Sequence, residues 1–217
     1  MYCQSCGSTL PDEAGYCNKC GSKQEFRMIG FSSKIHDPAF QKYLKNSNRY
    51  AMIFAIIAAV IAVVAFTYYG ETSSEMDNPE AMMIGFGIGS MFLLIAIFQV
   101  VGKKKSKTWD GTVVNKTIEK KRRRQNSGEN DYYWVTYTQY DISIRDERGK
   151  THHILSADDP TLYNYYNVND RIRHHGGLNT YEKFDKSQDT IIFCNACASL
   201  NDIKNDTCFR CGCPLLK

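Results

Sequence analysis

The sequence predicts a multi-part membrane protein: a two-helix transmembrane hairpin, a small antiparallel β domain, and a cysteine-rich module at each end of the chain. Three observations predict this fold class. Two long stretches contain no charged residue, one cysteine spacing occurs twice, and the segment between them is rich in β-branched and aromatic residues. Because the apolar residues are concentrated in two stretches, we do not expect one globular core.

The two uncharged stretches, residues 51–69 and 81–101, predict a transmembrane hairpin over 51–101. With a rise of ~1.5 Å per residue, about 20 helical residues cross the hydrocarbon of a bilayer. A pair of buried core helices is the alternative, and two such stretches in 217 residues disfavour it. The first stretch begins fifty residues into the chain, so we do not expect a cleaved signal peptide.

The flanking charges predict the topology. Residues 1–49 hold seven Lys or Arg against four Asp or Glu, and GKKKSK follows the second stretch, whereas the connection at 70–80 is acidic. Because basic segments stay on the cytoplasmic side, we expect a multi-pass protein of the inner (plasma) membrane with both termini cytoplasmic. Ala81, Gly85 and Gly89 form a small-residue face for the first helix or for a second copy.

Residues 25–50 are predicted to be a linker and a juxtamembrane amphipathic helix. Asp37 followed by Pro38 is typical of a helix start, because Asp caps free amides and Pro suits the first turn. We expect this helix to lie on the inner membrane surface, with an unstructured linker as the alternative. Its apolar face consists of Phe40, Tyr43 and Leu44.

The spacing C-x2-C-x10-C-x2-C occurs at both ends of the chain and predicts metal-binding modules at 1–24 and 191–217. A C-x2-C turn places two thiolates on one side of a metal, and two turns complete a tetrahedral zinc site. The expected ligands are Cys3, Cys6, Cys17 and Cys20 at the first site, and Cys194, Cys197, Cys208 and Cys211 at the second.

We expect one structural Zn²⁺ at each site, because four thiolates leave no open position and so small a module needs metal to fold. Disulfides need an oxidising compartment, and a redox pair needs a strand–helix–strand context that is missing here. Iron in a four-thiolate site stays open. A swapped pairing of one turn from each terminus also stays open, although local closure costs less entropy.

Two positions depart from the repeat. Gly7, Gly21 and Gly212 follow metal-site turns, where a positive φ is often needed, but Ala198 stands at the fourth such position and predicts a slightly irregular turn. Cys213 is the ninth cysteine and has Ser22 as its counterpart in the first module. It is either a spare thiol beside the site or an exchange ligand.

The stretch YCQSCGSTLPDEAGYCNKCGSK resembles the short zinc ribbon at the N-terminus of many bacterial membrane proteins. The whole layout is similar to uncharacterised zinc-ribbon membrane proteins of Gram-positive bacteria, with a ribbon, two spans, a β-rich segment and a second ribbon. The resemblance implies metal binding and a membrane location, and it implies no established activity. The matching positions are Cys3, Cys6, Gly7, Cys17, Cys20 and Gly21.

Residues 108–190 are predicted to form a cytoplasmic β-rich domain. Strands are expected around Val113 and Val114, at 131–146, at 151–157 and around Ile172, because these stretches are rich in β-branched and aromatic residues, which alternate with polar ones in the later part of 131–146. Several short strands without a long helix favour a small antiparallel sheet, or a barrel of SH3-like or OB-like size. Asp159 is expected to cap a short helix.

A run of five cations follows the first expected strand of this domain: Lys120, Lys121, Arg122, Arg123 and Arg124. A solvated hairpin is the simplest interpretation. Contact with anionic lipid is a second one, because the run follows the second span closely. Nucleic acid, with Tyr side chains for stacking, is a third and ranks below lipid.

No catalytic motif is found in the sequence, so we expect that the protein is not an enzyme. His152–His153 and His174–His175 are not expected to bind a metal as pairs, because neighbours on a strand point to opposite faces and seldom share one ion. We expect them to be ordinary half-exposed residues. Asp158 and Asp159 can pair as carboxylates, but no acid–base partner is placed beside them.

The expected function is that of a non-enzymatic, membrane-anchored scaffold whose zinc ribbons bind a protein partner. The closed metal sites and the termini on the same side of the membrane support it. Two alternatives use the same residues: a metal or redox sensor, and a membrane-tethered nucleic-acid-binding protein.

Overall fold

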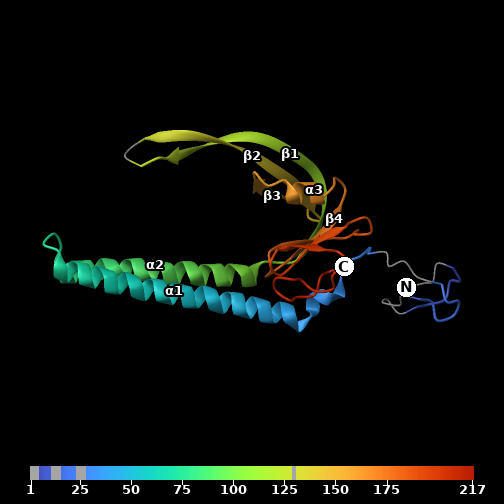
Figure 1. Cartoon of the computed structure of the whole chain (residues 1–217), viewed down its shortest axis with the longest axis horizontal. Helices are drawn as coiled ribbons and strands as arrows, with labels where there is room; N and C mark the ends of the chain where they lie inside the picture. The colour runs from blue at the N-terminus through green and yellow to red at the C-terminus, as the bar shows by residue number, and fades with distance from the viewer. Residues whose placement is uncertain (1–4, 11–15, 23–27, 129–130) are drawn as a thin grey trace.

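The structure is a computed structural model that describes residues 5–10, 16–22, 28–128 and 131–217. Figure 1 shows a long helical hairpin, a sheet with a projecting two-stranded arm (residues 119–126 and 132–139), and the C-terminal segment packed beside the start of α1. The helices are η1 Ser33–His36, α1 Pro38–Thr72, α2 Asn78–Lys105 and α3 Thr161–Tyr165. The strands are β1 Trp109–Asn126, β2 Tyr132–Asp146, β3 Thr151–Ala157, β4 Arg171–His175, β5 Thr180–Lys183, β6 Ile191–Phe193 and β7 Leu200–Asp202. This layout confirms the predicted fold class.

Helices α1 and α2 form the predicted hairpin and are long and apolar enough to cross a membrane. Only 6% and 22% of their most apolar windows are buried, unlike the core helices of a soluble protein. Ala81, Gly85 and Gly89 are buried. A Cβ on Gly85 would lie 3.1 Å from Val63 Cα, and one on Gly89 3.4 Å from Ala59 Cα. The small-residue face therefore packs on α1 of the same chain.

The apolar face at the start of α1, which was expected on the membrane surface, packs against the C-terminal ribbon. Asp37 caps the helix by accepting a hydrogen bond from the Ala39 amide at 2.8 Å, and the helix then continues unbroken to Thr72. Phe40 is 2% exposed because it packs into the C-terminal ribbon, with Ala39 and Tyr43 beside it. The apolar face of this segment is thus covered by the chain itself.

The sheet is antiparallel, with the strand order β3-β2-β1-β4-β5. In the described residues β3 and β5 are its two edges, so it is open and not the barrel that the strand lengths allowed. The strands expected at 131–146, at 151–157 and around Ile172 are present as β2, β3 and β4. Strand β1 is longer than expected because the whole basic run belongs to it.

One core lies between this sheet and α3. Its buried members are Val113, Ile142, Ile144, Tyr165, Tyr166 and Ile172. Asp159 accepts a hydrogen bond from the amide of Thr161, the first residue of α3, but the N-cap position is Pro160, one residue later than expected. Tyr165 of α3 is 7% exposed and packs edge-on against Phe193 of β6, so the sheet and the C-terminal ribbon are in contact.

The chain that leads into α1 is attached to the sheet beyond β5. The Gly30 amide donates to the Phe184 carbonyl at 2.8 Å, and the Lys186 amide donates to the Met28 carbonyl at 2.8 Å. The buried carboxylate of Glu182 accepts from the Ser32 amide at 2.7 Å and from Lys186 Nζ at 3.0 Å. Because a buried charge is stable only with such partners, this cluster holds the segment before α1 in place.

The chain that leaves α2 is attached to the same domain. The Gly176 amide donates to Thr108 Oγ1 at 3.0 Å. A Cβ on Gly176 would clash with the backbone of Ser106 and Lys107, so only glycine allows the turn after β4 to approach so closely. The start of α1 and the end of α2 are therefore both bound to the sheet and ribbon.

Phe40→Ala is expected to detach the C-terminal ribbon from α1. Loss of a buried Phe side chain costs about 3–5 kcal/mol, because a cavity replaces its contacts. Reaction of Cys213 with a maleimide, measured on the detergent-solubilised chain, should become faster. Phe209→Ala is the matched control in the same ribbon, because Phe209 is 76% exposed. Equal labelling rates in the two variants would contradict the shared core.

Candidate metal centres

The C-terminal ribbon gathers four cysteine sulfurs into one group. Cys194 and Cys197 come from the turn after β6, and Cys208 and Cys211 from the turn after β7. All four Sγ atoms lie within 4.8 Å of one another, with Cys194–Cys211 at 3.5 Å and Cys197–Cys208 at 3.6 Å. Tetrahedral zinc with bonds of about 2.3 Å needs sulfurs about 3.8 Å apart. The donor set and its spacing therefore fit zinc.

The N-terminal module repeats this arrangement in its described part. Cys6, Cys17 and Cys20 form a second group, with Cys6 and Cys17 sulfurs 3.6 Å apart. Cys3 lies outside the described residues. Each group draws its described cysteines from one end of the chain, so the structure shows local closure and not the swapped pairing.

The metal-site turns share one backbone geometry. Three of the turns have both of their cysteines in the described residues. In each, the amide of the residue that follows the second cysteine donates to the carbonyl of the first cysteine, at 2.8–2.9 Å. Gly7, Gly21 and Gly212 have φ near 70°, in the left-handed region. Ala198 has φ 56° and adopts the same conformation. The irregular turn predicted there is wrong: the backbone is regular, and the alanine bears the strain of a conformation that suits glycine.

A serine accompanies the cysteines at a fixed position, which the spacing analysis missed. Ser8, Ser22 and Ser199 each stand five residues after the first cysteine of a turn. Ser199 Oγ lies 2.9 Å from Cys197 Sγ and 3.1 Å from Cys208 Sγ, and Ser8 contacts Cys6 and Cys17 in the same way. A hydroxyl that donates to a thiolate stabilises its charge. The repeated pattern C-x2-C-G/A-S is the sequence signal for this position.

Cys213 occupies the fourth of these serine positions. Its carbonyl accepts from the Cys208 amide at 2.8 Å, as the Ser22 carbonyl does from Cys17. Its side chain is 2% exposed and its thiol lies 3.7 Å from the Ala39 carbonyl of α1. Burial raises the pKa of this thiol. Cys213 therefore packs in the core between ribbon and helix, outside the group of four ligating sulfurs.

Burial opposes ionisation of the thiols in the C-terminal group. Burial raises the pKa of Cys194 to about 12 and also raises the pKa of Cys211. At Cys208 burial acts in the same direction, but hydrogen bonds from Ser199 and nearby amides outweigh it and lower the pKa to about 6. Neighbouring thiolates repel one another in a buried site. A divalent ion would remove this conflict, because its charge favours every thiolate.

The other predicted residues lie away from these centres. Lys120 to Arg124 are on β1, in the arm. Asp158 and Asp159 each bind a different backbone amide: Asp158 accepts from the Thr138 amide, and Asp159 accepts from the Thr161 amide. In the described part of the chain no histidine joins a candidate metal group.

His152 and His153 are partly exposed, as expected, with 22% and 49% of their side chains accessible, but the second pair differs from the expectation. His174 and His175 are each 5% exposed. His175 Nε2 lies 2.7 Å from Glu182 Oε2, and His174 contacts the Lys107 carbonyl at 3.0 Å. His152 stacks on Trp109 with ring centroids 4.0 Å apart. The buried pair thus takes part in holding the hairpin ends on the sheet.

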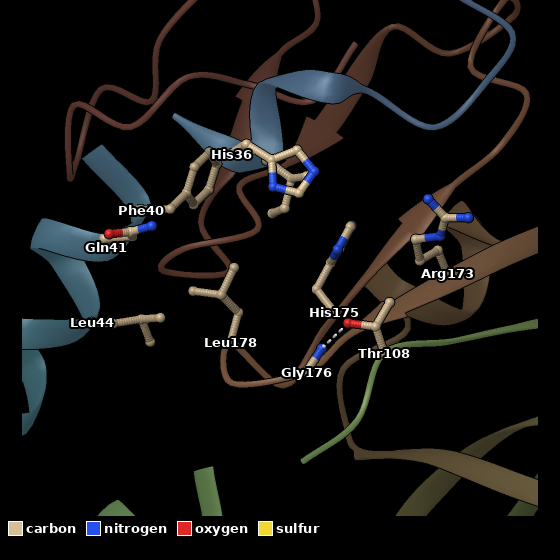
Figure 2. A pocket seen from close by; sticks show the side chains of 10 residues that line it. His36, Phe40, Gln41, Leu44, Thr108, Arg173, His175, Gly176 and Leu178 are labelled. Atoms are coloured by element: carbon tan, nitrogen blue, oxygen red, sulfur yellow. Dashed lines mark hydrogen bonds between the residues drawn. The ribbon is translucent and has the colours of Figure 1, made fainter. Parts of the chain in front are cut away.

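A cavity of about 290 Å³ lies where α1, the α2 exit and β4 meet. Figure 2 shows His36 and His175 facing each other across it, with Arg173 to one side and Leu44 to the other. Arg173 forms two hydrogen bonds with Asp110, at 2.6 and 2.8 Å, and lowers the pKa of that carboxyl. Arg173 therefore already joins β4 to β1 through Asp110, and His175 is already in contact with Glu182.

Metal analysis of the purified full chain should find two zinc ions per chain. Cys208→Ser should lower the content to one, because three thiolates bind zinc much more weakly than four. Cys213→Ser should leave it at two, since serine is the residue of the other three turns. If Cys213→Ser binds as little zinc per chain as Cys208→Ser, then Cys213 is a zinc ligand and this prediction is wrong.

Ala198→Gly is expected to stabilise the C-terminal site by about 1 kcal/mol, because glycine adopts the left-handed conformation without strain. The measurement is the chelator concentration that removes half of the zinc, which should rise. Ala196→Gly, the same substitution in the same turn, is the control and should lower this concentration, because Ala196 is only 8% exposed and has no positive φ. A lower midpoint for Ala198→Gly would contradict the geometry.

Comparison with known proteins supports the cysteine geometry at one end. Residues 2–24 match the family model of a zinc-ribbon domain. No curated protein and no solved structure matches the chain significantly. The N-terminal module is therefore similar to zinc ribbons, and the group of four cysteines near the C-terminus repeats its spacing.

Proposed function

We propose that the protein is a non-enzymatic, membrane-anchored zinc-ribbon protein that presents a binding surface for another protein at the inner face of the membrane. One observation carries the proposal: the C-terminal ribbon shares a core with the first turn of α1, through Phe40. A ribbon attached in this way is held at a fixed place beside the helical hairpin.

The charge distribution supports the orientation. Basic residues Lys103, Lys104 and Lys105 end α2, whereas the connection between the helices is acidic. With the basic side in the cytoplasm, both ribbons and the sheet lie there too. The reducing cytoplasm keeps the thiols available for zinc. The zinc has a structural role, because four thiolates complete its coordination.

The two ribbons then have different tasks. The C-terminal ribbon buries its apolar residues against α1, so it stabilises the junction with the membrane helices. The described buried residues of the N-terminal ribbon, Leu10 and Cys17, form a separate cluster, and Figure 1 shows this ribbon at the end of the molecule away from the helical hairpin. Tyr16 is 65% exposed on it. We assign partner binding to the N-terminal ribbon.

A metal or redox sensor is the second candidate, and the burial of the sulfurs favours it at one site only. Cys6 and Cys20 are exposed, whereas Cys194 and Cys208 are buried. Because oxidants reach exposed thiolates first, a sensor would release the N-terminal zinc under mild oxidant and keep the C-terminal zinc. A structural role predicts that both ions stay bound until the ribbons unfold.

Crosslinking of the full chain in its native membrane tests the proposal. Wild type and Phe209→Ala should crosslink to the same protein, because Phe209 lies on the other ribbon. Tyr16→Ala should weaken this product about tenfold, as expected for the loss of an aromatic hot spot, and Cys17→Ser with Cys20→Ser should abolish it. An identical product from all four chains would contradict partner binding by the N-terminal ribbon.

A further inference from the structure

We propose that the two-stranded arm formed by residues 119–126 of β1 and 132–139 of β2 binds the anionic surface of the membrane leaflet, through both its cations and its aromatic residues. The inference rests on the proposed placement of α1 and α2 in a membrane. It adds four aromatic residues of β2 to the basic run: Tyr132, Tyr133, Trp134 and Tyr137.

The arm projects beyond the sheet. Strand β4 pairs with β1 only from Trp109 to Thr112, and β3 pairs with β2 only from Gln139 to Arg145. From the Lys120–Thr138 pair to the Asn126–Tyr132 pair, neither β1 nor β2 pairs with any other strand. A segment of this kind has two free faces and no core of its own. Its side chains are therefore available for a surface outside the protein.

The pairing register distributes the cations over both faces. Lys120, Arg122 and Arg124 lie on one face and pair with Thr138, Thr136 and Trp134. Lys121 and Arg123 lie on the other face and pair with Tyr137 and Val135. Directly paired residues of antiparallel strands share a face. Each face of the arm thus combines positive charge with aromatic rings.

The rings and cations lie in contact while both stay accessible. The Arg124 guanidinium lies 3.3 Å from the ring centroid of Tyr132, and that of Arg123 lies 5.9 Å from Tyr137. Trp134 is 66% exposed and Tyr133 48%. Rings of this amphipathic kind settle at the headgroup level of a bilayer, and each nearby cation is attracted to anionic lipid.

The charge of the arm is left largely unbalanced. Lys121 pairs with Glu119 at 3.2 Å, but the other four cations of the run have no carboxylate partner among the described residues. Like charges at successive positions repel one another. An anionic surface relieves this repulsion, whereas a merely solvated hairpin gains nothing from five adjacent cations.

The position of the arm favours lipid over nucleic acid. Helix α2 ends at Lys105 and β1 begins at Trp109, so the strand that carries the arm starts close to the end of this helix. Figure 1 shows the arm extending in the same direction as α1 and α2, toward the bilayer that would surround them. Charged residues are excluded from hydrocarbon. The arm must therefore bend to lie along the leaflet, and the irregularity between Val113 and Asn115 is the place where its twist can change.

Quenching of Trp134 by brominated lipid tests the proposal on the full chain. The protein is reconstituted in vesicles of brominated phosphatidylcholine, alone or mixed with phosphatidylglycerol. The signal of Trp134 is the difference between wild type and Trp134→Phe, which leaves Trp109 unchanged. We expect this signal to be quenched in the anionic vesicles and not in the neutral ones. Absence of quenching in both, or equal quenching in both, would overturn the proposal.

Charge variants identify the residues responsible. Lys120→Gln with Arg122→Gln and Arg124→Gln should abolish the quenching in anionic vesicles. The control Arg148→Gln with Lys150→Gln, two exposed cations at the opposite end of β2, should keep it. If the arm variant is quenched as strongly as the control, the arm is not the contact.

Two further measurements separate the remaining outcomes. Single-stranded RNA added to the neutral vesicles would change Trp134 emission if the arm bound nucleic acid. If this change occurs and no lipid quenching is seen, the arm binds nucleic acid and the lipid proposal is wrong. Alkaline carbonate extraction reports insertion of α1 and α2. Extraction of the protein would overturn the membrane placement together with this inference, whereas an inserted protein without quenching would overturn this inference alone.

Discussion

Burial of Phe40 in the core of the C-terminal ribbon is the contact on which the rest of the structure depends. The ribbon is too short to build a core from its own residues. It completes one by taking an aromatic ring from the first turn of α1 and by placing Leu215, Leu216 and Cys213 around it. The long apolar helix gains a defined orientation in return. The C-terminal ribbon, its candidate metal site and helix α1 are thereby parts of one packed unit.

A second set of contacts prevents this unit from turning relative to the sheet. Glu182 is buried and joins the Ser32 amide, Lys186 and His175 in one cluster. Removal of one member would leave a buried charge without its partner, which is far more costly than loss of an exposed ion pair. Gly176 adds a close backbone contact with the α2 exit. The entry and the exit of the hairpin are thus held by the same domain.

The two cysteine modules show how one motif acquires different roles from its surroundings. Both place cysteine sulfurs together with serine hydroxyls, and in both the residue after each C-x2-C turn has the left-handed conformation. Only the C-terminal module has an apolar helix packed against it, and there Cys213 replaces the serine. The thiol suits this core because Cys behaves as a small apolar side chain and packs beside Phe40, Leu215 and Leu216.

The sequence alone determined the features that depend on local spacing. Four cysteines at C-x2-C-x10-C-x2-C must come together if the turns close, a long uncharged run must form an apolar helix, and alternation at Tyr140, Ile142 and Ile144 must form a strand. Only the tertiary structure decided what covers each surface. Phe40 packs on a ribbon about 150 residues further along the chain, and His175 meets Glu182 inside the protein. No periodic pattern in the sequence links the residues of such a contact, because the contact arises from packing in three dimensions and not from the repeat of a helix, strand or turn.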